Sequence, residues 1–239
     1  MTRIALITGT SRGLGRTIAT LLADEGWDLV LTARGRDALD EVAAKLGPRT
    51  GRVLAVAGDI TDASHRRRLA EGAADLGGLD LLVNNASDLG PSPMPALASY
   101  PPDRLGEVYA TNVLAPIALT QEVLPLLRAR RGLVVNVTSD AAVEAYTGWG
   151  GYGSSKAALE HASRILAEEL RGDGVGVAIV DPGDMRTDMH QAAFPGQDIS
   201  DRPPPEVTVP FWAWLVEQEP LRVTARRFRA QGESWEMAS

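Results

Sequence analysis

Short apolar runs alternate with stretches of helical spacing along most of the chain. The apolar runs predict strands at Arg3–Thr8, Asp28–Ala33, Arg52–Ala57, Leu79–Asn84, Gly132–Thr138 and Gly176–Val180. Between them, apolar residues three or four positions apart predict helices. Examples are Leu14, Ile18, Leu21 and Leu22, then Leu39, Val42 and Leu46, and two longer helices at about 102–130 and 152–171. Strands that alternate with helices are typical of βαβ units and a parallel sheet.

The composition of the strands indicates how the sheet is covered. They are mostly apolar rather than alternating, so we expect helices on both of its faces. No linker, repeat or low-complexity tract interrupts the series. The predicted fold class is therefore α/β, with a doubly wound, Rossmann-like and mostly parallel sheet in a single domain over residues 1–239.

Composition and charge exclude several functional classes. The chain has 239 residues, of which 44% are hydrophobic, enough for a large core. Its formal net charge is −7, so general binding to nucleic acid or to an anionic membrane is not expected. It has no cysteine, which removes disulfides and Cys-ligated zinc and favours a cytoplasmic location. The early apolar run Ile4–Ile7 is too short for a signal peptide or a membrane span.

A glycine-rich turn follows the first predicted strand, where a doubly wound fold binds its ligands. Residues 8–15 read T-G-T-S-R-G-L-G. Gly9, Gly13 and Gly15 would let the backbone approach a phosphate, toward which the next helix directs its free N–H groups. Ile18 stands where G-x-G-x-x-G has its third glycine, and a merely tight loop is the alternative.

The end of the second strand discriminates between cofactors. An NAD site usually has an acid there for the ribose 2′-OH, whereas an NADP site has a cation for the 2′-phosphate. The strand ends in Arg34, and Arg12 lies in the glycine loop, so we expect NADP(H) rather than NAD(H). Two solvated surface arginines are the alternative. Asp37 is assigned to the start of the following helix, where an acid favours the helix dipole.

A tyrosine and a lysine stand four residues apart in Y-G-S-S-K, at Tyr152 and Lys156. On a helix such residues share one face. An ammonium within ~4–6 Å favours the phenolate, so Lys156 would move the Tyr152 pKa from about 10 toward the working pH of a general acid. Such pairs are also common by chance, and a solvated helix turn is the alternative.

Taken together, the motifs resemble those of the short-chain dehydrogenases/reductases, in the same order, over about residues 3 to 190. The glycine turn is similar to the family's T-G-x-x-x-G-x-G loop. The further matches are Asp59-Ile60 to its D-V or D-I pair, Asn84-Asn85-Ala86 to N-N-A, and Pro182-Gly183 with Thr187 to P-G-x-x-x-T. The catalytic four of the family are matched by Asn112, Ser139, Tyr152 and Lys156.

This resemblance implies an NAD(P)-dependent oxidoreductase that acts on CH–OH or C=O groups. Tyr152 would be the general acid/base, Ser139 would hold the substrate oxygen, and Lys156 would also hold the nicotinamide ribose. The implied cofactor-binding residues are Gly9, Ser11, Arg12, Gly13, Leu14, Gly15, Arg34, Asp59, Ile60, Asn85, Ala86, Tyr152, Lys156, Pro182, Gly183, Met185 and Thr187. No metal site is expected, since His65, His161 and His190 lack ligand spacing.

The resemblance also implies that Asn112 anchors a water in a proton relay to the lysine, and Pro116 gives this role a physical basis. Proline has no N–H, so the Asn112 carbonyl loses its partner within the helix and the helix should kink. An ordinary kinked helix is the alternative.

Some residues depart from the family pattern or lie beside it. Ser87 stands where the family commonly has glycine, and it would be strained if this position requires a positive φ. Asp140 is expected to point away from the cleft or to cap its loop. The irregular segment at about 184–205 is expected to form a substrate lid, with a plain surface loop as the alternative. Its apolar residues, with Trp149 nearby, suit a carbonyl compound with hydrocarbon bulk.

The two long helices indicate self-association. Residues 113–127 are apolar on almost every face, and the helix at 152–171 has a similar surplus. We expect a two-fold related copy to cover them in a homodimer or homotetramer, unless the C-terminal region with Trp212 and Trp214 does so. The predicted function is NADP-dependent reduction of a small-molecule carbonyl compound or oxidation of the corresponding alcohol. The alternative is a non-catalytic NADP-binding sensor.

Overall fold

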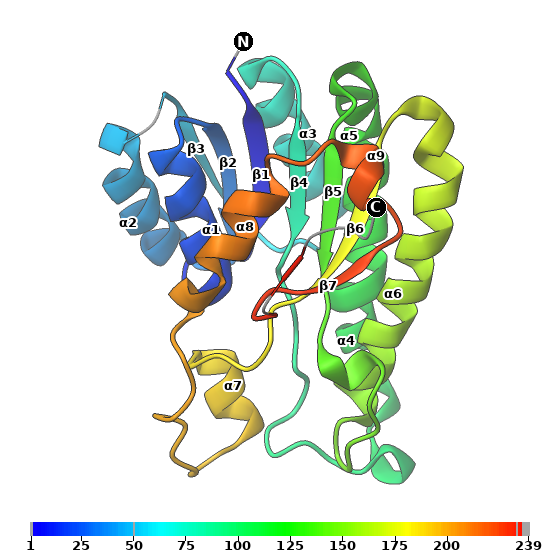
Figure 1. Ribbon diagram of the computed structural model, residues 1–239. Helices are drawn as coiled ribbons and strands as arrows, with labels where there is room; N and C mark the ends of the chain where they lie inside the picture. Colours follow the sequence, from blue (N-terminus) through cyan, green and yellow to red (C-terminus); the bar gives the residue numbers. More distant parts are fainter. Residues whose placement is uncertain (1, 50, 233, 236–239) are drawn as a thin grey trace.

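A parallel sheet organises the molecule. The computed structural model describes residues 2–49, 51–232 and 234–235, and these contain seven strands in the order β3-β2-β1-β4-β5-β6-β7 (Figure 1). The strands are β1 Ile4–Thr8, β2 Asp28–Ala33, β3 Val53–Ala57, β4 Leu81–Asn84, β5 Leu133–Val137, β6 Gly176–Asp181 and β7 Arg227–Arg229. The order of the strands reverses between the neighbouring central strands β1 and β4. The switch point of this doubly wound sheet therefore lies between them. The predicted fold class is confirmed.

Helices cover both faces of the sheet, as Figure 1 shows. The helices are α1 Gly13–Asp24, α2 Arg36–Leu46, α3 Ala63–Leu76, α4 Pro102–Tyr109, α5 Ala115–Arg130, α6 Gly150–Leu170, α7 Asp188–Ala193, α8 Val209–Leu215 and α9 Pro220–Val223. Successive strand residues point to opposite faces, so Ala5 and Ile7 join a core with α1, α2 and α8. Ile4 and Leu6 join a second core with α3, α5 and α6.

The C-terminal elements were not predicted from the sequence. β7 extends the sheet beside β6, with Arg227 in register with Ile179. α8 buries Phe211 and Trp212 in the core on the α1 face of the sheet. The idea that Trp212 and Trp214 cover the two long helices is therefore wrong, because α5 and α6 lie on the opposite face.

The long helix predicted at 102–130 is interrupted where Pro116 follows Asn112. Residues Ala110–Leu114 form a π-helical turn, in which the Ala115 N–H donates to the Ala110 carbonyl. A π turn accommodates an extra residue in the helix, and such turns are frequent at functional sites. The defect expected from the proline is present, but as a π turn between α4 and α5.

The stretch Pro102–Arg130 is also long and apolar enough to cross a membrane by length and hydropathy. In the fold, its residues Leu119, Val123 and Leu127 are buried in the core against the sheet. A core helix of this kind passes the same test of length and hydropathy, so the stretch is explained by its packing on the sheet.

Candidate functional site

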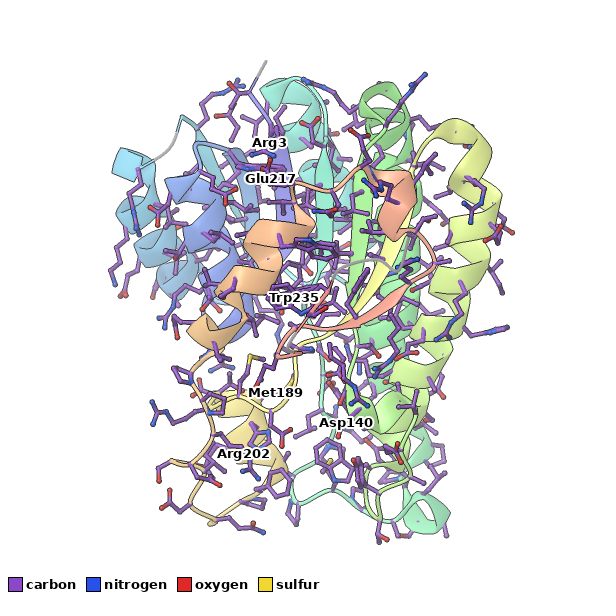
Figure 2. All side chains as sticks on the ribbon, viewed as in Figure 1. Arg3, Asp140, Met189, Arg202, Glu217 and Trp235 are labelled. Carbon is purple, nitrogen blue, oxygen red and sulfur yellow. The ribbon has the colours of Figure 1, made fainter. Side chains whose placement is uncertain are left out.

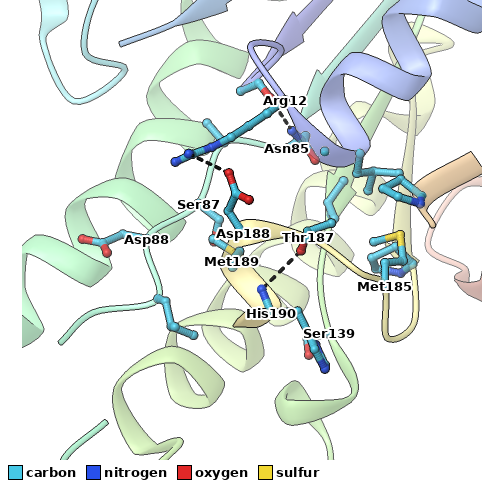
Figure 3. A pocket seen from close by; sticks show the side chains of 18 of the residues that line it. Arg12, Asn85, Ser87, Asp88, Ser139, Met185, Thr187, Asp188, Met189 and His190 are labelled. Atoms are coloured by element: carbon cyan, nitrogen blue, oxygen red, sulfur yellow. Dashed lines mark hydrogen bonds and ion pairs between the residues drawn. The ribbon is translucent and has the colours of Figure 1, made fainter. Parts of the chain in front are cut away.

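A cavity of about 1040 Å³ lies along the carboxyl ends of the strands, at the switch point. Loops that follow β1 to β6 line it, together with the segment that contains α7. It brings together all of the cofactor-binding and catalytic residues predicted from the sequence except Gly15 and Asn112. Figure 3 shows part of this cavity, with Ser87 and Asp88 on the side opposite Met185.

The glycine turn at one end of the cavity has the form needed for a phosphate. Gly9 and Gly13 have φ values of +74° and +54°, a region that suits glycine. Gly15 lies beneath the turn rather than in the cavity wall, because a Cβ there would stand 2.3 Å from the Gly9 carbonyl oxygen. Arg12 is the N-cap of α1, and its side chain makes no capping hydrogen bond. No cap from Arg12 therefore occupies the N–H groups of the first helical turn. This arrangement fits a pyrophosphate.

Asn85 shapes the glycine turn from the neighbouring strand. Its side-chain amide donates to the carbonyls of Thr8 and Gly9, at 2.8 and 3.2 Å. The Thr8 hydroxyl in turn accepts from the N–H groups of Asn85 and Ala86, both at 2.9 Å. Asn85 lines the cavity, but these bonds direct its amide to the loop, and direct contact with a cofactor stays a prediction.

The two predicted phosphate-binding arginines both line the cavity and are exposed. Arg12 makes an ion pair of 2.8 Å with Asp188 of α7, as Figure 3 shows, and both side chains are about 70% exposed, at 69% and 71%. Exposed ion pairs contribute only about 0–1 kcal/mol, so a phosphate can compete for Arg12. Burial alone raises the pKa of Asp59, but hydrogen bonds from Thr61 and the charge of Arg34 lower it below its ordinary value.

Tyr152 and Lys156 lie in the first two turns of α6, in the part of the cavity away from the glycine turn. Gly153 allows α6 to begin against the loop after β5, since a Cβ there would stand 2.5 Å from the Ala141 carbonyl oxygen. This close approach brings the Tyr152 hydroxyl near the side chains of Ser139 and Ser87. Tyr152 and Lys156 are 8% and 2% exposed, so neither belongs to a solvated helix turn.

The expectation that the Tyr152 pKa moves toward neutral pH is wrong. Burial raises the pKa of the Tyr152 hydroxyl well above its ordinary value, and the charges of Asp181 and Asp140 raise it further. The Lys156 Nζ lies 5.5 Å from the tyrosine ring centroid and donates to the Val137 carbonyl at 2.9 Å. Burial lowers the pKa of Lys156 to about 8, so the lysine is mainly charged at neutral pH.

The side chain of Asn112 is buried behind the cavity wall and fully engaged. Its Oδ1 accepts from the Asp88 N–H at 2.7 Å and from the Ser87 hydroxyl at 3.0 Å. Its Nδ2 donates to the Asp88 carbonyl at 2.8 Å and to the Ser155 hydroxyl at 2.9 Å. Asn112 thus joins the loop after β4 to α6, and a water on its backbone carbonyl stays a prediction.

Ser87 does not have the backbone strain that was expected of it. Among the described residues other than glycine, positive φ values occur at Arg131 and Ala225, and not at Ser87. Its hydroxyl donates to Asn112 at 3.0 Å, and its side chain lies near the Tyr152 hydroxyl. The serine therefore lies beside two of the predicted catalytic residues.

Of the two arrangements expected for Asp140, pointing away from the cleft is contradicted, because Asp140 lines the cavity, whereas capping its loop agrees with the hydrogen bond that it accepts from the Ala141 N–H. Its Oδ1 accepts from the Ser139 hydroxyl and the Ala141 N–H, both at 2.8 Å, and its Oδ2 accepts from the Tyr146 hydroxyl at 2.9 Å. Burial alone raises the pKa of Asp140, but these hydrogen bonds lower it below its ordinary value, so the group stays a carboxylate. Asp140 and Met189 both line the cavity, and Figure 2 shows Asp140 on the α6 side and Met189 on the α7 side.

The segment predicted as a lid contains α7 and packs over the tyrosine. Thr187 caps α7 by accepting from the His190 N–H at 3.2 Å. Phe194 lies 5.9 Å from Trp149, and Trp149 lies 5.9 Å from Tyr152, measured between ring centroids. His190, which the sequence did not single out for the site, lines the cavity beside Phe194. Within the described ranges, no group of three or more His, Asp or Glu side chains could hold a metal ion.

Comparisons with known proteins agree with this geometry. Residues 3–198 match the family model described as short chain dehydrogenase. A rhamnolipids biosynthesis 3-oxoacyl-[acyl-carrier-protein] reductase from Pseudomonas aeruginosa is 38% identical over 192 residues, which cover 76% of this chain and 72% of the relative.

Solved structures resemble the whole fold. A short chain dehydrogenase from Shigella flexneri, complexed with NADP, is 30% identical with a TM-score of 0.89, covering 96% of this chain and 97% of that one. A short chain dehydrogenase from Escherichia coli, complexed with NADPH, is 31% identical with a TM-score of 0.88, covering 96% and 97%. The resemblance thus extends beyond the motifs to the C-terminal elements.

Proposed function

Because this chain belongs to the short-chain dehydrogenase/reductase family, we propose that it is an NADPH-dependent carbonyl reductase with Tyr152 as its general acid. The observation that carries this proposal is that one cavity joins the glycine turn to Ser139, Tyr152 and Lys156. A phosphate cradle and a buried acid are the two parts that hydride transfer to a carbonyl requires. The alternative of a non-catalytic sensor has no observation that favours it.

The proposed cofactor is NADP(H). The turn formed by Gly9 and Gly13 would hold the pyrophosphate, while Arg12 and Arg34 would hold the 2′-phosphate. Lys156 and the Pro182-Gly183 turn line the part of the cavity where the nicotinamide and its ribose would lie. The NADP and NADPH complexes of the similar proteins support this choice.

In the proposed reaction, the cofactor held in this cavity would supply the hydride that the carbonyl carbon accepts. Tyr152 donates its hydroxyl proton to the carbonyl oxygen, so the product is an alcohol and the tyrosine is left as a phenolate. Lys156, charged at neutral pH, favours this phenolate. The Ser139 hydroxyl, which now donates to Asp140, would turn to donate to the substrate oxygen. Burial raises the pKa of Tyr152, so the phenol keeps its proton at neutral pH and can serve as the general acid of a reduction.

The substrate end of the cavity supports a neutral carbonyl compound with hydrocarbon bulk. Its wall includes Trp149, Leu89 and the alanines of α7, which pack with Tyr152. The Asp140 carboxylate lies beside Ser139, where it would repel a second negative charge. We therefore propose that keto acids are poor substrates compared with uncharged ketones or aldehydes of similar size.

We also propose that the protein works in the cytoplasm and as a homodimer or homotetramer. The lack of cysteine supports the first part of this proposal. Exposed apolar residues on the α5 and α6 side of the molecule support the second.

The direct test is Tyr152→Phe, assayed with NADPH and a panel of ketones, aldehydes and quinones by the nicotinamide absorbance. We expect turnover to be abolished and NADPH affinity to stay nearly unchanged, because only the hydroxyl is lost. Tyr109→Phe is the matched control, since it removes a phenol hydroxyl that bonds to Ser154 of the same helix. Turnover of Tyr152→Phe within about tenfold of the parent, a barrier change under ~1.4 kcal/mol, would contradict the assignment.

A further inference from the structure

The guanidinium of Arg227, on β7, makes hydrogen bonds to residues around the catalytic end of the cavity. Its Nε donates to Glu160 Oε1 at 2.9 Å. Its Nη2 donates to the Ser139 carbonyl at 3.0 Å and to Asp181 Oδ2 at 3.1 Å. The side chain is 17% exposed, so these bonds are largely shielded from water.

These partners belong to three elements that carry the site. Glu160 follows Lys156 by four positions on α6, so Tyr152, Lys156 and Glu160 share one face of that helix. Ser139 lies in the loop after β5 and lines the cavity, and its carbonyl accepts from Arg227. Asp181 ends β6, and its Oδ1 accepts from the Gly183 N–H at 3.0 Å, which orders the turn after that strand.

The charges of this cluster require the arginine. The side chains of Glu160 and Asp181 are 3% and 6% exposed, and buried carboxylates are costly unless they are paired. Glu160 has a second, more exposed partner in Arg164, at 2.9 Å. Burial alone lowers the pKa of Arg227, but Glu160 and Asp181 raise it, so the guanidinium stays charged. A planar fork can donate to several acceptors at once, which a lysine ammonium cannot do in the same geometry.

We propose that Arg227 is a positioning residue that fixes Ser139 relative to the helix of Tyr152 and Lys156 and to the Pro182-Gly183 turn. This inference rests on the proposed function, in which the Ser139 hydroxyl must be placed to donate to the substrate oxygen. Arg227 touches neither the substrate nor the cofactor in this role. It acts through the backbone of Ser139 and through the two carboxylates that it joins.

The test compares Arg227→Met with Arg229→Met, which removes the same charge from an exposed residue of the same strand. We expect Arg227→Met to lower kcat about 10- to 100-fold, as for a misplaced hydrogen-bond donor, with KM for the carbonyl substrate within about threefold. Hydrogen exchange at residues 139–143 should become at least about tenfold faster, while β5 and β6 stay protected. Arg229→Met should match the parent in both measurements.

Arg227→Lys keeps the charge without the fork, and it also serves if Arg227→Met does not fold. We expect the lysine variant to lose part of kcat and to show the same local increase in exchange. A kcat within about twofold of the parent in the methionine variant, or in the lysine variant where only that one folds, would overturn the inference. So would an even loss of protection across β5, β6 and β7, because a purely structural role predicts that. If Tyr152→Phe stays active, the proposed function fails, but the exchange measurement still decides whether Arg227 orders the Ser139 loop.

Discussion

Ser87 shows how a single residue changes the catalytic end of the cavity. The sequence identified it as a departure from the family's usual glycine, and backbone strain was the expected consequence. The structure instead has Ser87 outside the positive φ region, with its hydroxyl donating to Asn112. The side chain that was expected to strain the backbone therefore supplies a hydrogen bond to Asn112.

Ser87→Ala and Ser87→Gly should separate these two views. We expect both variants to lower kcat/KM about 5- to 100-fold, because the partly buried hydrogen bond that Ser87 donates to Asn112 is lost, at about 1–3 kcal/mol. Glycine should be no more stable than alanine, since no strain is relieved. Steady-state kinetics and thermal unfolding test this, with Ser99→Ala, an exposed loop serine, as the control. A glycine variant that gains stability or activity over the parent would support strain instead.

Residue chemistry was predictable where the side chain itself carries the signal. Tyr152 and Lys156 were noticed because they stand four residues apart on a predicted helix, and Ser139 was identified through the family resemblance. The direction in which the Tyr152 pKa shifts was not predictable, because the burial that raises it depends on several elements of the fold. Arg227 was missed because its partners are distant in sequence, with Glu160 lying 67 positions before it.

At the scale of elements, apolar pattern predicted six of the strands and the helices between them. β7 was not predicted, because its sequence R-F-R has only one apolar residue and the strand lies at the edge of the sheet. Pro116 correctly indicated a defect in the long helix, but whether the helix kinks or forms a π turn depends on tertiary packing. The sequence therefore located the helix defect without predicting its form.

The loop after β2 provides the test of cofactor preference. Arg34→Asp should weaken NADPH binding about 10- to 100-fold, because one charge-assisted hydrogen bond contributes ~1.5–3 kcal/mol, and it should relieve the bias against NADH. Arg36→Asp makes the same charge change at an exposed position two residues later that does not line the cavity, so its binding should match the parent. Fluorescence titration of both dinucleotides measures the effect. A parent protein that binds NADH as tightly as NADPH would rule out this role for Arg34.

At the scale of the whole molecule, apolar surface remains outside the two cores. Leu114, at the end of the π turn, is 62% exposed, and Ile165 of α6 is 48% exposed. The C-terminal aromatic residues pack on the other face of the sheet and do not cover this side. Packing within one chain therefore buries only some of the apolar faces of these helices. A second copy of the chain is the favoured partner for the faces that stay exposed.

The expected assembly is a homodimer or homotetramer built on the α5 and α6 side of the molecule. Sedimentation at micromolar protein should give a species at two or four times the chain mass of 25.4 kDa. Ile165→Asp and Leu114→Asp should shift this species toward the monomer, because each would place an unpaired carboxylate in a dry interface. Leu221→Asp is the control, since Leu221 is 41% exposed on α9, away from these helices. A sharp monomer peak for the parent protein would reject the assembly, and equal dissociation by the control variant would reject its location.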